Sequence, residues 1–146
     1  MGNGLPYFGR KSEENCAITA QLLPSININR TIDCCMGSGN FSRLVSCQME
    51  NVERIAFELE RSLYTLHMVI KDENKLNVVL RAMQKVPDTV EFYNMCEQIV
   101  KNYNGGIVDY DEEIVALSEL VFICFSMNSS RNIRRNTQYY LKINDD

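Results

Sequence analysis

An apolar run that ends in a glycine-rich turn is the segment of this sequence best suited to chemistry. The run covers residues 31–36 and leads into Gly37-Ser38-Gly39. Glycines in such a turn let the backbone approach a ligand closely, and a following helix offers N–H donors at its N-terminus. Glu58 ends the next apolar run, about 20 residues on, where dinucleotide-binding folds carry the acid that binds a ribose diol. The spacing predicts a nucleotide-like cofactor; the alternative is a tight turn and an ordinary surface acid.

The elements that must position these residues follow from hydrophobic periodicity. In the first half the pattern predicts a helix, a strand, a helix, a strand and a helix, over residues 12–23, 31–36, 40–48, 53–59 and 62–70. From residue 73 onward we expect helices only, over residues 73–85, 88–103 and 111–127. Residues 88–91 have the spacing of a capping box. The last helix is apolar on most faces, so we expect it to be central and buried.

A strand–helix–strand unit followed by a helical block is an incomplete sheet. Parallel sheets are normally covered on both faces and larger than a pair of strands. The sequence therefore predicts an α/β fold, an incomplete Rossmann-like sheet with an inserted or appended helical region. We place the cofactor segment at residues 1–72 and the helical segment at residues 73–146. A missing C-terminal half or a partner subunit would supply further strands.

Composition narrows the classes of protein. The chain has 146 residues, 45% of them hydrophobic and 23% charged, with a net charge of −4 at pH 7. This composition is ordinary for a globular protein. The negative net charge does not indicate that the chain as a whole binds a polyanion. Of the six cysteines, Cys34 and Cys35 are adjacent and the other four are scattered. Without a CxxC pair, and with His67 as the one histidine, they predict no metal site. Reduced thiols without a recognisable signal peptide predict a cytoplasmic protein, and the apolar run near residues 114–125 is too short to span a membrane.

Three segments, in order, resemble the N-terminal part of Dam-type adenine-specific DNA methyltransferases. They are Tyr7-Phe8-Gly9-Arg10-Lys11, residues 33–39, and Phe57-Glu58-Leu59 before Leu63-Tyr64-Thr65-Leu66. The family opens with an aromatic residue, a small residue and Gly-Gly-Lys. It continues with a strand ending in acidic-Pro-Phe-x-Gly-x-Gly, and a strand ending Asn-Asp or similar before a helix of the type Leu-x-x-Leu-Tyr. The likeness covers roughly the first seventy residues.

The resemblance implies a binding site for S-adenosyl-L-methionine. Its cofactor-binding residues would be Tyr7, Lys11, Asp33, Gly37, Ser38, Gly39 and Glu58. Tyr7 and Lys11 would contact the cofactor, Asp33 would lie beneath its amino-acid end, and Glu58 would hold its ribose hydroxyls. The chain departs from the family at Arg10, which replaces a glycine, at the Cys34-Cys35 pair, which replaces Pro-Phe, and at Glu58, which replaces the usual aspartate.

The second half resembles the family's helical target-recognition region in kind. Residues 126–131 resemble its Phe-Asn-Gly-type segment, so Asn128, Arg131, Arg134 and Arg135 would contact phosphates or bases of double-stranded DNA. The alternative is a solvated basic run at a helix C-terminus, which the helix dipole favours. The sequence leaves both open.

The family's catalytic loop is not found in this sequence. Its Asp/Asn-Pro-Pro-Tyr/Phe loop accepts hydrogen bonds from the adenine amine and stacks on the flipped base. Pro6, Pro24 and Pro87 are the three prolines, and none are adjacent. We assign no catalytic residue and expect a fragment, a truncated reading frame or a degenerate relative with little turnover alone. The alternatives are a non-catalytic module that binds S-adenosyl-L-methionine or DNA, and a dehydrogenase fragment, which is disfavoured because the G-x-G turn lacks the third glycine.

Overall fold

The computed structural model describes residues 13–22, 27–37, 41–42, 45 and 51–135. Within them the protein is mixed α/β, with five helices and two sheets of two strands each. The chain divides into two compact units, Met1–Leu59 and Glu60–Asp146. Among the helices in the described ranges, none has the length and apolarity that crossing a membrane requires.

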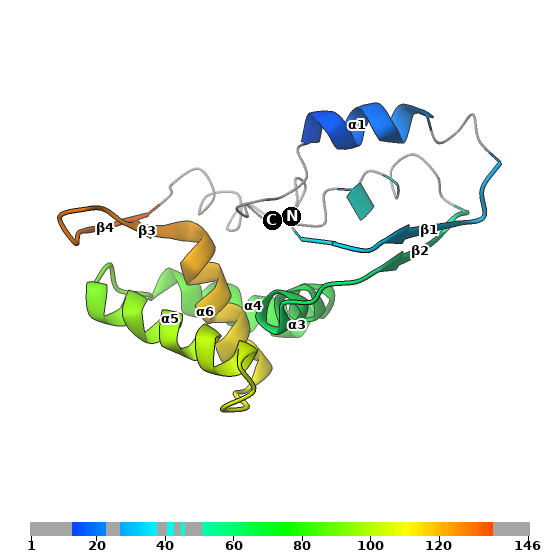
Figure 1. Cartoon of the computed structure of the whole chain (residues 1–146). Helices are drawn as coiled ribbons and strands as arrows, with labels where there is room; N and C mark the ends of the chain where they lie inside the picture. Colours follow the sequence, from blue (N-terminus) through cyan, green and yellow to red (C-terminus); the bar gives the residue numbers. More distant parts are fainter. Residues whose placement is uncertain (1–12, 23–26, 38–40, 43–44, 46–50, 136–146) are drawn as a thin grey trace. The chain divides into compact units, whose positions relative to one another are not determined.

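The first unit contains a helix and a parallel pair of strands (Figure 1). Helix α1 spans Glu13–Leu22, and β1 (Arg30–Asp33) pairs in parallel with β2 (Glu53–Ala56). These confirm the helix predicted at residues 12–23 and the two predicted strands, although both strands end earlier than expected. Residues 41, 42 and 45 of the helix expected at 40–48 are helical, and its other residues lie outside the described ranges.

Backbone hydrogen bonds continue to join the two segments beyond the carboxyl ends of β1 and β2. The N–H of Phe57 donates to the carbonyl of Asp33 (2.8 Å), and the N–H of Met36 donates to the carbonyl of Phe57 (2.8 Å). The backbone after β1 thus bends into a turn while it remains tied to the residues after β2. This places the ends of the two strands side by side.

The second unit is built around one central helix. Helices α3 (Arg61–Lys71), α4 (Glu73–Gln84) and α5 (Val90–Asn104) all pack against α6 (Glu112–Cys124) (Figure 1). The buried residues of α6 are Val115, Ala116, Ser118, Glu119, Leu120, Val121 and Cys124. The prediction of a buried central helix is confirmed. His67, in α3, is half-buried.

The unit boundary lies before α3, whereas the boundary expected from the sequence lay at residues 72/73. Helix α3 buries Leu63, Leu66 and Val69, and it packs against α6 and α4. Burying those apolar side chains among the other helices removes their surface from water, which is the dominant favourable term in folding. Helix α3 is therefore part of the helical unit.

The expectation of helices only after residue 73 is wrong. Helix α6 ends at Cys124, and Phe125–Met127 (β3) forms an antiparallel hairpin with Ile133–Arg135 (β4). The hairpin places Phe125 in a buried position, 3% exposed. Continuing the helix to residue 127, as the apolar pattern predicted, would not give this pairing.

The cap of α5 also differs from the expected capping box at residues 88–91. The N-cap is Thr89, whose hydroxyl accepts from the N–H of Phe92 (3.3 Å). The carboxylate of Asp88 instead pairs with the guanidinium of Arg135. The local pattern assigned the side chain of Asp88 to the cap of α5, but this side chain pairs with the distant Arg135.

Candidate functional site

The turn after β1 carries the first part of the candidate site. Gly37 has φ of +54°, in the left-handed region that glycine adopts without steric penalty. Asp33, at the end of β1, is 6% exposed, and its Oδ1 accepts from the N–H of Cys35 (3.2 Å). The carboxylate therefore shapes the turn from inside, as a side chain that bonds its own backbone two residues on.

Glu58 lies directly against this turn. Its Oε2 accepts a hydrogen bond from the N–H of Gly37, with an N···O distance of 2.8 Å. The two residues are 21 positions apart in sequence, and the parallel pairing of β1 with β2 brings them together. The acid and the turn that the sequence paired are thus neighbours at one edge of the sheet.

The arrangement offers an acceptor group at the carboxyl ends of two parallel strands. In open α/β sheets, ligands bind outside this edge, and an acid after the second strand bonds a ribose diol. A carboxylate has two oxygens and about four lone-pair sites, so one bond from Gly37 does not exhaust its capacity. Glu58 is half-buried, which leaves part of the group in contact with solvent.

The structure brings together only some of the predicted cofactor residues. Asp33, Gly37 and Glu58 meet at the turn, as described. The remaining candidates lie outside the described residues, namely Tyr7, Lys11, Ser38 and Gly39. Their roles stay predictions.

The candidate DNA-contacting residues lie on the β3–β4 hairpin and not at the end of a helix. Asn128 is a turn-forming residue: its Oδ1 accepts from the N–H groups of Ser130 (3.0 Å) and Asn132 (2.9 Å). Arg131 sits in the tip of the hairpin with φ of +59°, and Arg134 lies on β4. Both arginines are exposed.

Arg135 is held by the protein itself. Its guanidinium pairs with Asp88, donates to the carbonyl of Val86 (2.9 Å) and lies over the Phe125 ring at 5.5 Å from the centroid. These contacts tie the hairpin to the segment between α4 and α5. The alternative of a solvated basic run at a helix C-terminus does not describe this residue.

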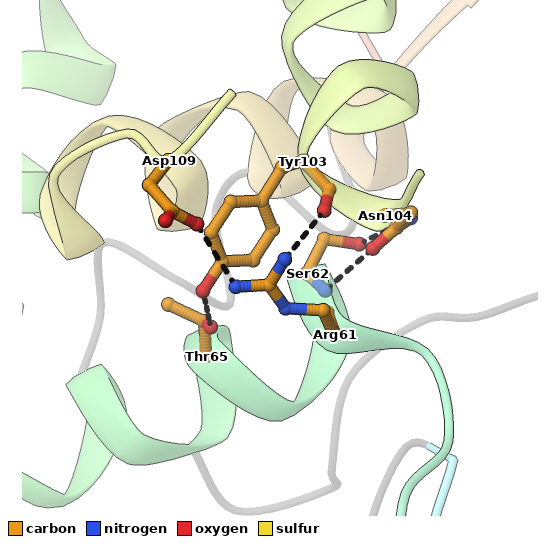
Figure 2. A network of polar contacts seen from close by, with 6 residues as sticks. All are labelled: Arg61, Ser62, Thr65, Tyr103, Asn104 and Asp109. Carbon is orange, nitrogen blue, oxygen red and sulfur yellow. Dashed lines mark hydrogen bonds and ion pairs between the residues drawn. The ribbon is translucent and has the colours of Figure 1, made fainter. Parts of the chain in front are cut away.

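A polar network that the sequence did not reveal joins α3 to the end of α5 (Figure 2). The guanidinium of Arg61 donates to the carbonyl of Tyr103 (3.0 Å) and to Asp109 (3.1 Å), and it lies 4.3 Å from the centre of the Tyr103 ring. The hydroxyls of Thr65 and Tyr103 are 2.8 Å apart. Because Arg61 and Tyr103 are 42 residues apart, no local pattern could have paired them.

A cavity of about 360 Å³ adjoins this network, near the lower limit for small-molecule sites. It is lined by Arg61, Tyr64, Thr65, Met68, Tyr103 and Glu112. The charged groups at its wall are engaged with other side chains, since Arg61 pairs with Asp109 and Glu112 pairs with Lys75 (2.6 Å). The hydrogen bond and the charge of Glu112 raise the pKa of Lys75. These contacts indicate a structural role for the charges.

The described thiols fall into two classes. Cys16, Cys96 and Cys124 are buried, whereas Cys34 and Cys35 are exposed. Burial raises the pKa of Cys96, and it raises the pKa of Cys124 to about 12. In the part of the chain that the structure describes, no group of three or more His, Cys, Asp or Glu side chains could hold a metal ion.

Comparisons with known proteins identify no relative of this chain. Neither a family model, nor a curated protein, nor a solved structure matches this chain.

Proposed function

We propose that this chain is a cytoplasmic part of an adenine-specific DNA methyltransferase of the Dam type. In this proposal the β1–β2 pair begins a Rossmann-like sheet, and its edge binds S-adenosyl-L-methionine. The observation that carries it is the 2.8 Å hydrogen bond between the Gly37 N–H and Glu58 Oε2. That bond puts an acid beside a glycine turn at the edge where such folds bind an adenosine.

The proposal gives each described residue a task. Glu58 accepts from the ribose hydroxyls of the cofactor, either beside the bond from Gly37 or in its place. Gly37 keeps the backbone clear of the ligand, and Asp33, which bonds the N–H of Cys35, holds the turn in shape beneath it. S-adenosyl-L-methionine supplies the activated methyl group when bound.

The second unit would meet DNA through its hairpin. Arg131 and Arg134 are exposed there and would contact phosphates of double-stranded DNA. Asn128 and Arg135 would act indirectly, because Asn128 bonds the turn and Arg135 fixes the hairpin to Asp88. Since the chain has no two adjacent prolines, the groups that polarise the adenine amine would come from residues outside it.

Calorimetric titration of the full chain with S-adenosyl-homocysteine, and separately with NAD, tests the cofactor assignment. We expect binding of S-adenosyl-homocysteine and a loss of about 10- to 100-fold in affinity for Glu58→Gln. This range corresponds to about 1.5–3 kcal/mol for a hydrogen bond to a charged group. The amide keeps the size of the side chain and removes its charge.

Glu53→Gln is the matched control, because Glu53 lies at the other end of β2 and pairs with Arg30 at the surface (2.6 Å). It should bind like the unmodified chain. A preference for NAD, or equal affinity of the Glu58→Gln variant and the unmodified chain, would overturn the assignment.

The second candidate is a non-catalytic module that binds S-adenosyl-L-methionine or DNA. The lack of adjacent prolines favours it. The coding sequence after the Asp146 codon separates the candidates. An Asp-Pro-Pro-Tyr loop encoded there, in frame or one base out of frame, supports the enzyme, and a region that encodes no such loop nearby supports the module.

A further inference from the structure

Two neighbouring thiols stand at the bend that follows β1. Cys34 and Cys35 are both exposed, and neither is part of a disulfide. They lie between Asp33, at the end of the strand, and Gly37, which bonds Glu58. Any chemical change at this pair acts directly on the turn.

The other described thiols are protected from oxidants. Cys16, Cys96 and Cys124 are 3%, 1% and 0% exposed. The reactive form of cysteine is the thiolate, and burial raises the pKa of Cys124 to about 12, so this thiol stays protonated at neutral pH. Among these five cysteines an oxidant in solution therefore meets Cys34 and Cys35 first. Cys47 lies outside the described residues.

A bond between the two sulfur atoms would disturb the backbone. Neighbouring Cα atoms are about 3.8 Å apart across a trans peptide, whereas disulfides usually join Cα atoms about 4.4–6.8 Å apart. The peptide group between the two cysteines must then distort, and its N–H is the one that Cys35 donates to Asp33 Oδ1 (3.2 Å). The next two N–H groups, of Met36 and Gly37, hold the turn against the residues after β2.

We infer that Cys34 and Cys35 form a peroxide-sensitive dithiol, and that its oxidation to a disulfide releases the turn from Glu58. One thiolate, whose proton has gone to solvent, attacks an oxygen of hydrogen peroxide; the O–O bond breaks, a sulfenic acid forms, and the departing hydroxide takes a proton from solvent and leaves as water. The second thiol then attacks the sulfenic sulfur, the S–S bond forms, and the hydroxyl leaves as water with the thiol proton. Formation of the disulfide removes two electrons from the two thiols and reduces one hydrogen peroxide to two waters.

The experiment treats the full chain with hydrogen peroxide, traps the remaining thiols with an alkylating agent and maps them by peptide mass spectrometry. We expect the peptide with Cys34 and Cys35 to lose two hydrogen atoms and to regain them with dithiothreitol. Amide hydrogen exchange at Met36 and Gly37 should become faster in the oxidised protein, by at least severalfold. Cys96 and Cys124 should react with the alkylating agent only after unfolding.

Cys34→Ser is the matched variant, since it removes one sulfur at an exposed position and keeps a polar side chain. Its exchange rates at Met36 and Gly37 should not respond to peroxide. Three outcomes would overturn the inference: no intramolecular disulfide at the pair, a disulfide without faster exchange, or the same faster exchange in Cys34→Ser. The experiment contains no cofactor, so its result is independent of the methyltransferase proposal.

Discussion

Asn104 at the end of α5 caps the beginning of α3 from another element. Helix α3 follows Glu60, whose side chain makes no capping hydrogen bond. Instead the N–H of Ser62 donates to Asn104 Oδ1 (2.8 Å), and Asn104 Nδ2 donates to Ser62 Oγ (3.0 Å) (Figure 2). Asn104→Ala therefore removes the cap of α3 without altering α3 itself.

The expected loss of stability is about 2 kcal/mol. Ser62 is 0% exposed, and the loss of the acceptor of its N–H costs about 1–3 kcal/mol. The hydroxyl of Ser62 keeps Glu60 Oε1 as a partner at 3.3 Å, so its loss is smaller. Asn104→Asp keeps an acceptor for the N–H of Ser62. Its negative charge is favourable at the N-terminus of α3 and unfavourable at the C-terminus of α5, so the two dipole effects offset each other and the variant should lose only about 0–1 kcal/mol.

Urea unfolding followed by far-ultraviolet circular dichroism measures these differences. With a slope of about 1–3 kcal/mol per molar urea, Asn104→Ala should lower the midpoint by about 1 M. Asn102→Ala is the control, because Asn102 accepts from the exposed Gln98 (2.8 Å) and reaches Tyr110 only at 3.4 Å. Two results would show that the cap is not what stabilises α3. One is equal urea midpoints for Asn104→Ala and Asn102→Ala, and the other is an equal loss of stability in Asn104→Asp and Asn104→Ala.

Two further predictions concern the hairpin and the core. Arg135→Ala should destabilise the chain by about 1–3 kcal/mol, mainly because it leaves the carbonyl of Val86, a buried residue, without this donor. The ion pair with the half-exposed Asp88 contributes less. Arg134→Ala, at an exposed position, should change stability by less than about 0.5 kcal/mol, and thermal unfolding compares the two variants. The pKa of Cys124 rises on folding from its ordinary 9.0 to about 12. The contribution of the protonated Cys124 thiol to stability is therefore complete below pH 9. It is lost between pH 9 and 12, because the unfolded chain releases the proton in that range. The loss approaches about 1.4 kcal/mol per pH unit in that window, and unfolding at alkaline pH should show a shallower decline for Cys124→Val. If stability declines equally with pH in the unmodified chain and in Cys124→Val, ionisation of Cys124 is not the cause of the decline.

The helices were accessible to prediction because their signals are local. The repeat of apolar residues, such as Leu63 and Leu66 in α3, depends only on spacing within a few turns. Asp72 caps α4 by accepting from Asn74 and Lys75, both within three residues. The apolar segment after Cys124 carries no such local signal of its end, and the predicted helix ran on through residues that form β3.

The candidate site could be foreseen in part. Spacing alone paired Glu58 with the turn at Gly37, and the parallel strands do bring them into contact at 2.8 Å. The direct bond between them was not predictable, because it depends on the register of β1 with β2, in which Asp33 pairs with Ala56. The burial of Asp33, which is 6% exposed, was not predictable from spacing either.

Spacing, caps and apolar periodicity thus determined which segments are helices and where an acid would meet a glycine turn. Tertiary structure decided the partners across long separations: Asn104 with Ser62, Arg61 with Tyr103, and Arg135 with Asp88. Those contacts join residues more than 40 positions apart, so they form only when loops close and helices pack around α6. A pattern read over a few neighbouring residues carries no information about which distant side chain arrives beside it.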